Sequence, residues 1–173
     1  EIDYGLIRLL RTRFDERITI VPGDAVQTIA QRRPIEEVPA PSLVVGNLPY
    51  SSAAPILAAL LETPVSAKCR RMVFTVQREM AERMTALPGT KAYSPLTVLT
   101  ELAGSARVHG ELSGASFYPR PEVVSAIVTL EPTSGSFPLR RLASICARSL
   151  FARRRKTVRN NAGVLASALG LSE

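Results

Sequence analysis

Four consecutive residues, Asn47 to Tyr50, have the types needed to act on the exocyclic amine of a nucleobase. Such an amine is a weak nucleophile because its lone pair is delocalised into the ring. Hydrogen-bond acceptors facing its two N–H groups favour a more pyramidal, more reactive nitrogen. The side-chain carbonyl of Asn47 is one such acceptor. The backbone carbonyl of Leu48 can be the second, since Pro49 stiffens the turn and holds the preceding residue extended.

Tyr50 adds a flat ring on which an unstacked base can lie. Asn and Pro are also common turn residues, so the tetrapeptide alone fits a plain strand-to-helix turn equally well. Its position directly after the apolar run Ser42–Gly46 favours the chemical interpretation. Open α/β sheets bind their ligands in the crevice at the ends of the strands.

A second aromatic candidate is Phe117, which opens the proline-rich run Phe117–Pro121 between two apolar segments. Its ring could close the other face of a flipped base. On the local pattern alone, a core or hinge aromatic is the stronger interpretation.

Two acidic residues are candidates for holding a ligand. Asp24 follows an apolar segment and can accept from a ligand's amine, cap a helix, or do both. Glu1 opens a helix together with Ile2. An acid at the end of the second strand of a nucleotide-binding sheet commonly holds ribose hydroxyls, although Glu1 by position is only a terminal residue.

The charge balance predicts a polyanionic partner. The chain has 22 Lys and Arg against 15 Asp and Glu, a net charge of +7, which suits either nucleic acid or an anionic membrane surface. The basic residues cluster near the C-terminus, where we expect five charges on about two helical turns. A solvated face is the plain alternative, but Arg offers bidentate phosphate contacts and like charges this close repel one another. The cluster comprises Arg153, Arg154, Arg155, Lys156 and Arg159.

Composition excludes several classes of protein. Hydrophobic residues make up 46% of the chain and charged residues 21%, which predicts a folded core. Cys69 and Cys146 form no CxxC pattern and His109 is the only histidine, so we expect neither a disulfide framework nor a metal site. No apolar run is long enough to span a bilayer and no signal peptide is visible. We therefore expect a cytoplasmic protein that has no membrane partner.

Apolar periodicity and turn residues predict an α/β fold with a mostly parallel sheet and an antiparallel hairpin at one edge. The predicted strands are Arg17–Pro22, Ser42–Gly46, Arg71–Val76, Ala106–Leu112 and Val124–Leu130. The predicted helices are Ile2–Phe14, Ser51–Glu62, Gln77–Leu87 and Tyr93–Ala103, with a loop at Arg33–Pro41. A linker at Pro132–Pro138 precedes a purely helical region. The predicted domains are therefore residues 1–131 and 132–173.

Several of these segments, in this order, resemble the ribosomal RNA adenine dimethyltransferase family, of the type that acts on small-subunit rRNA. The asparagine tetrapeptide combined with the proline-rich stretch is much more specific than either alone. The matching segments are EID at Glu1, GDA at Gly23, VVGNLPY at Val44, VQREMAERM at Val76, FYPRPEVVSAIV at Phe117 and FARRRKTVRNN at Phe151.

The resemblance implies a Rossmann-like S-adenosylmethionine methyltransferase sheet with a small all-α C-terminal RNA-binding domain. It also implies that the first two strands and a glycine-rich cofactor loop precede Glu1, and that the helical domain continues past Glu173. The absent loop makes the activity of this chain by itself doubtful.

The resemblance also implies a role for each residue. Asn47 and the Leu48 carbonyl would hold the target amine, with Pro49 shaping the turn, and Tyr50 and Phe117 would sandwich the adenine. The cofactor would lie against Glu1, Ile2, Asp24, Ala25 and Asn47.

The reaction that the resemblance implies is in-line attack of the amine nitrogen on the sulfonium methyl carbon, with no metal. The substrate would be two adjacent adenines near the 3′ end of small-subunit rRNA, methylated by a monomer during ribosome assembly.

Three alternatives remain open. A large-subunit rRNA methyltransferase that confers antibiotic resistance would share the fold, but more often carries Ile where Leu48 stands. A DNA adenine methyltransferase would usually have two prolines in the tetrapeptide. A non-catalytic RNA-binding assembly factor would have lost the cofactor loop, which the sequence upstream of Glu1 would reveal.

Overall fold

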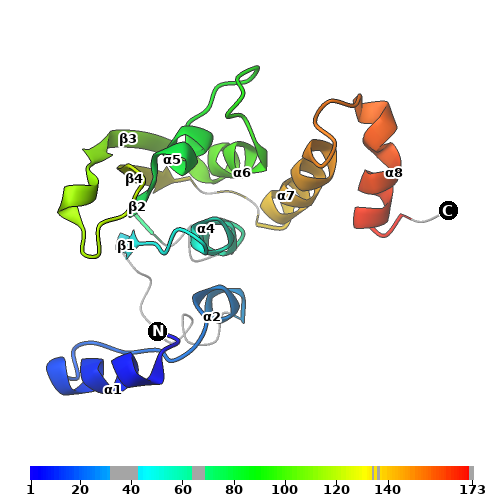
Figure 1. The fold of residues 1–173 in the computed structure, drawn as a ribbon. Coiled ribbons are helices and arrows are strands. Elements are labelled where there is room, and N and C mark those ends of the chain that lie inside the picture. The colour runs from blue at the N-terminus through cyan, green and yellow to red at the C-terminus, as the bar shows by residue number, and fades with distance from the viewer. Residues whose placement is uncertain (32–42, 64–68, 134, 136, 172–173) are drawn as a thin grey trace.

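The computed structural model describes residues 1–31, 43–63, 69–133, 135 and 137–171 (Figure 1). Its centre is a four-stranded sheet with the order β1-β2-β4-β3. The strands are β1 Leu43–Asn47, β2 Arg71–Gln77, β3 Gly104–Leu112 and β4 Ser125–Pro132. The α/β class is confirmed, and so is the antiparallel hairpin of β3 and β4 at one edge.

The expected mostly parallel sheet is wrong for the described residues. Strand β1 pairs with β2 in parallel, but β2 with β4 and β3 with β4 are both antiparallel. The reason lies in the connections. A parallel pair needs a long crossover, usually a helix, but β3 and β4 are joined through the short 3-10 helix η2, Gly114–Ser116, so β4 turns back antiparallel to β3. Strand β4 then lies between β3 and β2, where it also runs antiparallel to β2.

The core lies between the sheet and the helices that follow its strands. Side chains in β2 alternate between buried and half-buried, and those in β4 do so over most of their length, as a strand with one covered face requires. Each fully buried large apolar side chain contributes roughly 1.5–3 kcal/mol. The helices of this part are α1 Tyr4–Arg13, α2 Ala25–Gln31, α4 Ala53–Leu61, α5 Arg78–Met84 and α6 Pro95–Ala103. The most deeply buried core residues include Leu57, Leu61, Met72, Phe74, Val76, Val128 and Leu130.

The strand expected at Arg17–Pro22 is wrong, because this segment has no regular secondary structure and Ile18 is about half exposed. A strand needs a neighbour along its length, and within the described residues the bonds of this segment to a distant part of the chain are those with Glu1. The backbone nitrogen of Glu1 donates to the Val21 carbonyl at 3.0 Å, and Gly23 N–H donates to the Glu1 carbonyl at 2.8 Å. Two hydrogen bonds on one residue do not make a ladder. The loop expected at Arg33–Pro41 lies outside the described residues.

Helix α1 has the predicted spacing of apolar residues, but much of its apolar face is exposed. The Asp3 carboxylate caps it by accepting from Leu6 N–H at 2.8 Å. Ile7 is buried, whereas Leu6 and Leu9 are each about half exposed. Spacing therefore predicted the helix correctly, although it did not show which of its apolar residues are covered.

The C-terminal region consists of two helices, α7 Phe137–Phe151 and α8 Val158–Ala168. Helix α7 packs along α6, and α8 packs along α7 (Figure 1). The predicted linker is shorter than expected, because β4 includes Pro132 and α7 begins at Phe137. Arg140 is buried and donates to the Thr133 carbonyl at 2.6 Å. Burial lowers the pKa of this guanidinium below its ordinary value.

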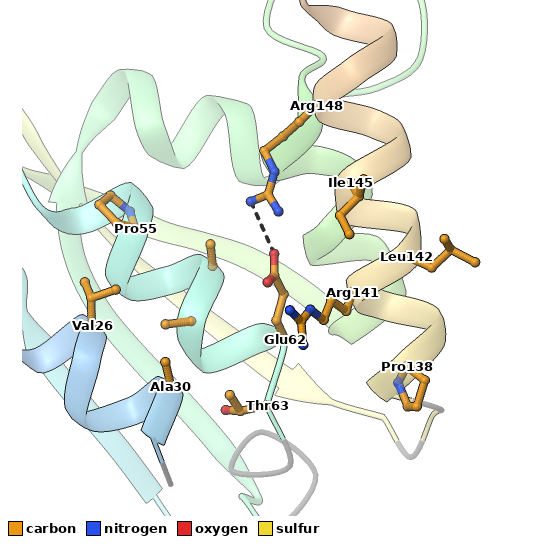
Figure 2. Close-up of a pocket in the computed structure, with 12 residues that line it drawn as sticks. Val26, Ala30, Pro55, Glu62, Thr63, Pro138, Arg141, Leu142, Ile145 and Arg148 are labelled. Carbon is orange, nitrogen blue, oxygen red and sulfur yellow. Dashed lines mark ion pairs between the residues drawn. The ribbon is translucent and has the colours of Figure 1, made fainter. Parts of the chain in front are cut away.

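Glu62 joins α7 to the sheet domain at the end of α4 (Figure 2). The hydroxyl of Ser144 donates to its Oε1 at 2.6 Å, and Arg148 Nη1 lies 3.4 Å from the same oxygen. Only 19% of the Glu62 side chain is exposed, so these contacts are partly shielded from solvent. One carboxylate therefore holds two consecutive turns of α7.

Glu62→Ala should lower the free energy of unfolding by about 1–3 kcal/mol, because it leaves Ser144 and Arg148 without their acceptor. Glu62→Gln should cost less, since its amide oxygen can still accept from Ser144. Urea unfolding measures both, with Glu101→Ala on the exposed face of α6 as the matched control. A Glu62→Ala loss equal to that of the control would mean that this contact does not hold α7.

Candidate nucleobase and RNA site

A pocket of about 350 Å³ opens at the carboxyl end of β1. Two segments far apart in the sequence form its walls. It is lined by Asn47, Leu48, Pro49, Tyr50, Phe117, Tyr118, Pro119 and Pro121. The structure thus brings Phe117 and the asparagine tetrapeptide to one place, and Phe117 is half-buried there and not part of the buried core.

The tetrapeptide is held from beneath by Leu48. Its side chain is buried, and its N–H donates to the Thr75 carbonyl of the neighbouring strand at 3.2 Å. Ser52 N–H donates to the Pro49 carbonyl at 3.0 Å, which turns the chain into α4. Asn47, the last residue of β1, remains exposed. The turn is therefore fixed while its asparagine stays accessible to a ligand.

Gly46 gives Leu48 the room it needs. A Cβ at this position would lie 2.9 Å from Leu48 Cδ2 and 3.3 Å from Phe74 Cδ1. The first distance is shorter than real Cβ contacts, so a side chain at residue 46 must displace Leu48. The glycine before the tetrapeptide is thus part of what shapes the pocket.

Tyr50 is anchored at its hydroxyl, which lies 2.5 Å from Ser125 Oγ. Ser125 is the first residue of β4 and is completely buried. In the sheet order, β2 lies between β1 and β4, so the Tyr50 side chain reaches across the end of β2. The sequence analysis gave Ser125 no role. The available signal was a serine hydroxyl at the start of a largely apolar strand.

The second wall is a compact loop. A Cβ on Gly114 would lie 2.7 Å from the Pro121 carbonyl, so the two ends of the loop approach closely. Phe117 is half-buried, whereas Tyr118 is fully exposed. The Tyr118–Pro119 peptide bond is cis. Of the two aromatic residues in this loop, Phe117 is the one held against the protein.

The acidic candidates Glu1 and Asp24 lie together and do not line this pocket. The hydrogen bond from Gly23 to the Glu1 carbonyl places them side by side. Backbone N–H groups of Asp3 and Ile2 donate to Glu1 Oε1, and they hold the pKa of that carboxyl below its usual value.

Asp24 Oδ1 accepts from Gln27 N–H at 2.9 Å. This bond confirms the capping interpretation of Asp24 and leaves the other carboxylate oxygen, Oδ2, for a ligand. Ile2 and Ala25 are both exposed beside the two acids.

The basic run does not lie on two helical turns, and that expectation is wrong. Residues 153–156 form the turn between α7 and α8, and only Arg159 is helical. Thr157 breaks the helix by capping α8, its hydroxyl accepting from Asn160 N–H. The Asn161 side chain then closes the turn by donating to the Leu150 and Arg153 carbonyls.

Arg154 differs from its basic neighbours. Its guanidinium donates to the Lys91 carbonyl at 2.7 Å and to the Thr90 carbonyl at 2.8 Å. It also lies over the Phe151 ring, 5.6 Å from the ring centre. Arg154 therefore ties the basic turn to the loop before α6. The exposed cations left for a polyanion in this turn are Arg153, Arg155 and Lys156.

A larger hollow, of about 770 Å³, lies between α2, α4 and α7 (Figure 2). Apolar side chains such as Val26 and Ile145 line it together with Glu62, Arg141 and Arg148. It contains none of the residues that the sequence analysis proposed. In the described ranges, no three His, Cys, Asp or Glu side chains gather into a possible metal cluster. No helix there is long and apolar enough to cross a membrane.

The fold is α/β with a pocket at the carboxyl end of β1, and comparison with known proteins specifies the family. The family model described as ribosomal RNA adenine dimethylase matches residues 1–168. The chain belongs to this family.

Similar curated proteins support the same family assignment. The Treponema pallidum (strain Nichols) protein named ribosomal RNA small subunit methyltransferase A is 39% identical over 163 residues, which are 93% of this chain and 55% of the relative. The protein of the same name from Synechococcus sp. (strain JA-3-3Ab) is 37% identical over 171 residues, 95% of this chain and 59% of the relative. The chain thus spans little more than half the length of these relatives.

Two solved structures share the fold. A dimethyladenosine transferase from Plasmodium falciparum superposes with a TM-score of 0.72 at 28% identity, covering 93% of this chain and 57% of that one. The 23S rRNA methyltransferase ErmE superposes with a TM-score of 0.63 at 26% identity, covering 94% and 64%. These similarities confirm the α/β methyltransferase fold.

Gly46→Ala should lower the free energy of unfolding by about 1–3 kcal/mol, because the added methyl group overpacks against Leu48. Gly110→Ala on β3 is the matched control, since nothing lies within 4 Å of a Cβ there. Urea unfolding and a structure of the variant measure the cost and the displacement of Leu48. Equal stability of the two variants would show that Gly46 is not needed beneath the turn.

Proposed function

We propose that the protein transfers methyl groups from S-adenosylmethionine to the exocyclic amines of two adjacent adenines near the 3′ end of small-subunit rRNA, during ribosome biogenesis. The observation that carries this proposal is the pocket in which Asn47, Leu48, Tyr50 and Phe117 meet. The names of the similar curated proteins support rRNA of the small subunit as the substrate.

The protein's own groups act mainly by holding the base and its amine. Asn47 Oδ1 and the Leu48 carbonyl accept from the two N–H groups of the target amine. Tyr50 and Phe117 receive the two faces of the adenine. Flipping a base out of its stack costs a few kcal/mol, and each aromatic contact recovers about 1–3 kcal/mol. Aromatic contacts on both faces of the adenine roughly offset the cost of flipping it, which explains why both walls of the pocket carry an aromatic ring.

The acidic pair fits S-adenosylmethionine because its carboxylates are hydrogen-bond acceptors for the hydroxyl and amine groups of the cofactor. The cofactor supplies a methyl group already activated by a sulfonium, so the protein needs no metal or covalent nucleophile. Glu1 presents an exposed carboxylate that suits ribose hydroxyls, and Asp24 keeps one oxygen free for the adenine amine. Ile2 and Ala25 flank the pair, and Asn47 completes the proposed cofactor contacts.

The basic turn serves a separate purpose, which is to grip rRNA phosphates. We assign phosphate contacts to Arg153, Arg155, Lys156 and Arg159, and a positioning role to Arg154. Residues 1–131 are then the catalytic domain and residues 132–173 the RNA-binding domain.

We place the protein in the cytoplasm as a monomer. Both of its cysteines are free thiols, which suits a reducing compartment.

Large-subunit rRNA is the second candidate substrate, because the fold also superposes on ErmE. The names of the curated relatives and Leu48 in the tetrapeptide favour the small subunit. A non-catalytic RNA-binding role is less well supported, since the acceptor groups and both aromatic walls are intact.

Asn47→Ala should reduce methyl transfer by at least about a hundredfold while leaving RNA affinity within about twofold, because Asn47 contacts the amine and not the phosphates. The assay gives the whole protein labelled S-adenosylmethionine and unmethylated small or large ribosomal subunits, and identifies dimethyladenosine after digestion. Transfer to the large subunit alone, or none with wild-type protein, would overturn the proposed function. Equal losses of binding and turnover in Asn47→Ala would overturn only the role of Asn47.

Replacing Arg153, Arg155 and Lys156 by Ala should flatten the salt dependence of RNA binding by roughly 2–3 phosphate contacts, each contributing a slope of about 0.9. Tyr50→Ala should slow methylation without changing that slope. Arg8, Arg11 and Arg13, all exposed on α1, provide a control triple substitution with the same change of charge. A full salt slope in the first triple variant would mean that the basic turn is only a solvated surface.

A further inference from the structure

We propose that Ser125 is a positioning residue for methyl transfer, which acts by holding the hydroxyl of Tyr50 so that the tyrosine ring is ready to stack on the target adenine. This inference rests on the proposed function, because it assigns the ring its partner. It adds a residue outside both pocket-lining segments.

The placement of Ser125 suits this role. It is the first residue of β4, held between two neighbouring strands, with Gln77 of β2 on one side and Leu112 of β3 on the other. It is completely buried, so its hydroxyl cannot turn to solvent for a partner. The position of its Oγ is therefore set by the sheet, while Tyr50 lies on a turn outside it.

A buried hydroxyl is costly unless it is hydrogen-bonded, and Tyr50 supplies that bond. The same hydrogen bond explains why residue 50 is a tyrosine and not a phenylalanine. Stacking on a base requires only an aromatic ring, which phenylalanine also has. The phenolic hydroxyl adds a tether at the far end of the side chain.

Two fixed ends leave the ring little freedom. The backbone of Tyr50 is fixed by the turn that begins α4, and its hydroxyl is fixed by Ser125. A ring that is already oriented does not have to be ordered when the base arrives, so more of the stacking energy is available in the transition state. Because Phe117 belongs to the loop that leads into β4, the same contact also ties one wall of the pocket to the other.

The test compares Ser125→Ala, Tyr50→Phe and the double variant in the whole protein, using unmethylated small subunits. We expect each single variant to lower kcat about three- to tenfold, the factor that one hydrogen bond is worth, with the KM for the subunit changed less than about twofold. The double variant should be no slower than either single variant, since both remove the same bond. Ser149→Ala, which removes another buried, hydrogen-bonded hydroxyl away from the pocket, is the matched control and should keep the wild-type kcat.

A short RNA carrying 2-aminopurine at the target position gives a second measurement. Its fluorescence falls when the flipped base stacks on Tyr50, and both single variants should weaken this quenching. If Ser125→Ala does not fold, Tyr50→Phe leaves Ser125 in place and carries the test alone. Wild-type kcat and wild-type quenching in Tyr50→Phe, or losses that multiply in the double variant, would overturn the proposal while the proposed function stands. A wild-type protein that transfers no methyl group would overturn both.

Discussion

The antiparallel pairing of β4 with β2 is the constraint on which the pocket depends. Strands β1 and β2 run in parallel, so both end at the same edge of the sheet, where the asparagine tetrapeptide follows β1. Because β4 runs the opposite way, its first residues and the loop before them reach that same edge. A parallel β4 would place Phe117 at the far end of the sheet, and the two aromatic walls could not meet.

The pocket combines a rigid backbone turn with hydrogen-bond acceptors that a ligand can reach. Leu48 is buried over Gly46 and its N–H is bonded to the next strand, and both contacts fix the backbone of the turn that carries its carbonyl. Tyr50 is tethered to Ser125, and Asn47 stays exposed. Burial and hydrogen bonding thus orient these groups. The proposed reaction needs such positioning, because its methyl donor would already be activated.

Contacts between α7 and the sheet domain determine where the basic turn lies. Glu62 accepts from Ser144 and pairs with Arg148, while Arg154 donates to two carbonyls in the loop before α6. These links set where the exposed cations of the basic turn lie relative to the pocket at the carboxyl end of β1. Arg154, a residue of the basic run itself, supplies one of these links, while Arg153, Arg155 and Lys156 remain exposed.

The sequence by itself determined the α/β class, most helices and strands, and the residues of the tetrapeptide and the proline-rich loop. These features follow from local patterns. The spacing of apolar residues within a short segment predicts a helix or a strand, and Asn-Leu-Pro-Tyr has its donors and acceptors within four positions. Only the tertiary structure decided three features. They are the antiparallel pairing of β4 with β2, the irregular conformation of Arg17–Pro22, and the turn that separates the basic residues before Thr157 from helix α8. Each of these depends on a partner distant in sequence or on a cap that competes with the helix. Ser125 is the clearest example of a contact that the sequence does not reveal. Its hydroxyl has a hydrogen-bond partner only because Tyr50 reaches across the end of β2.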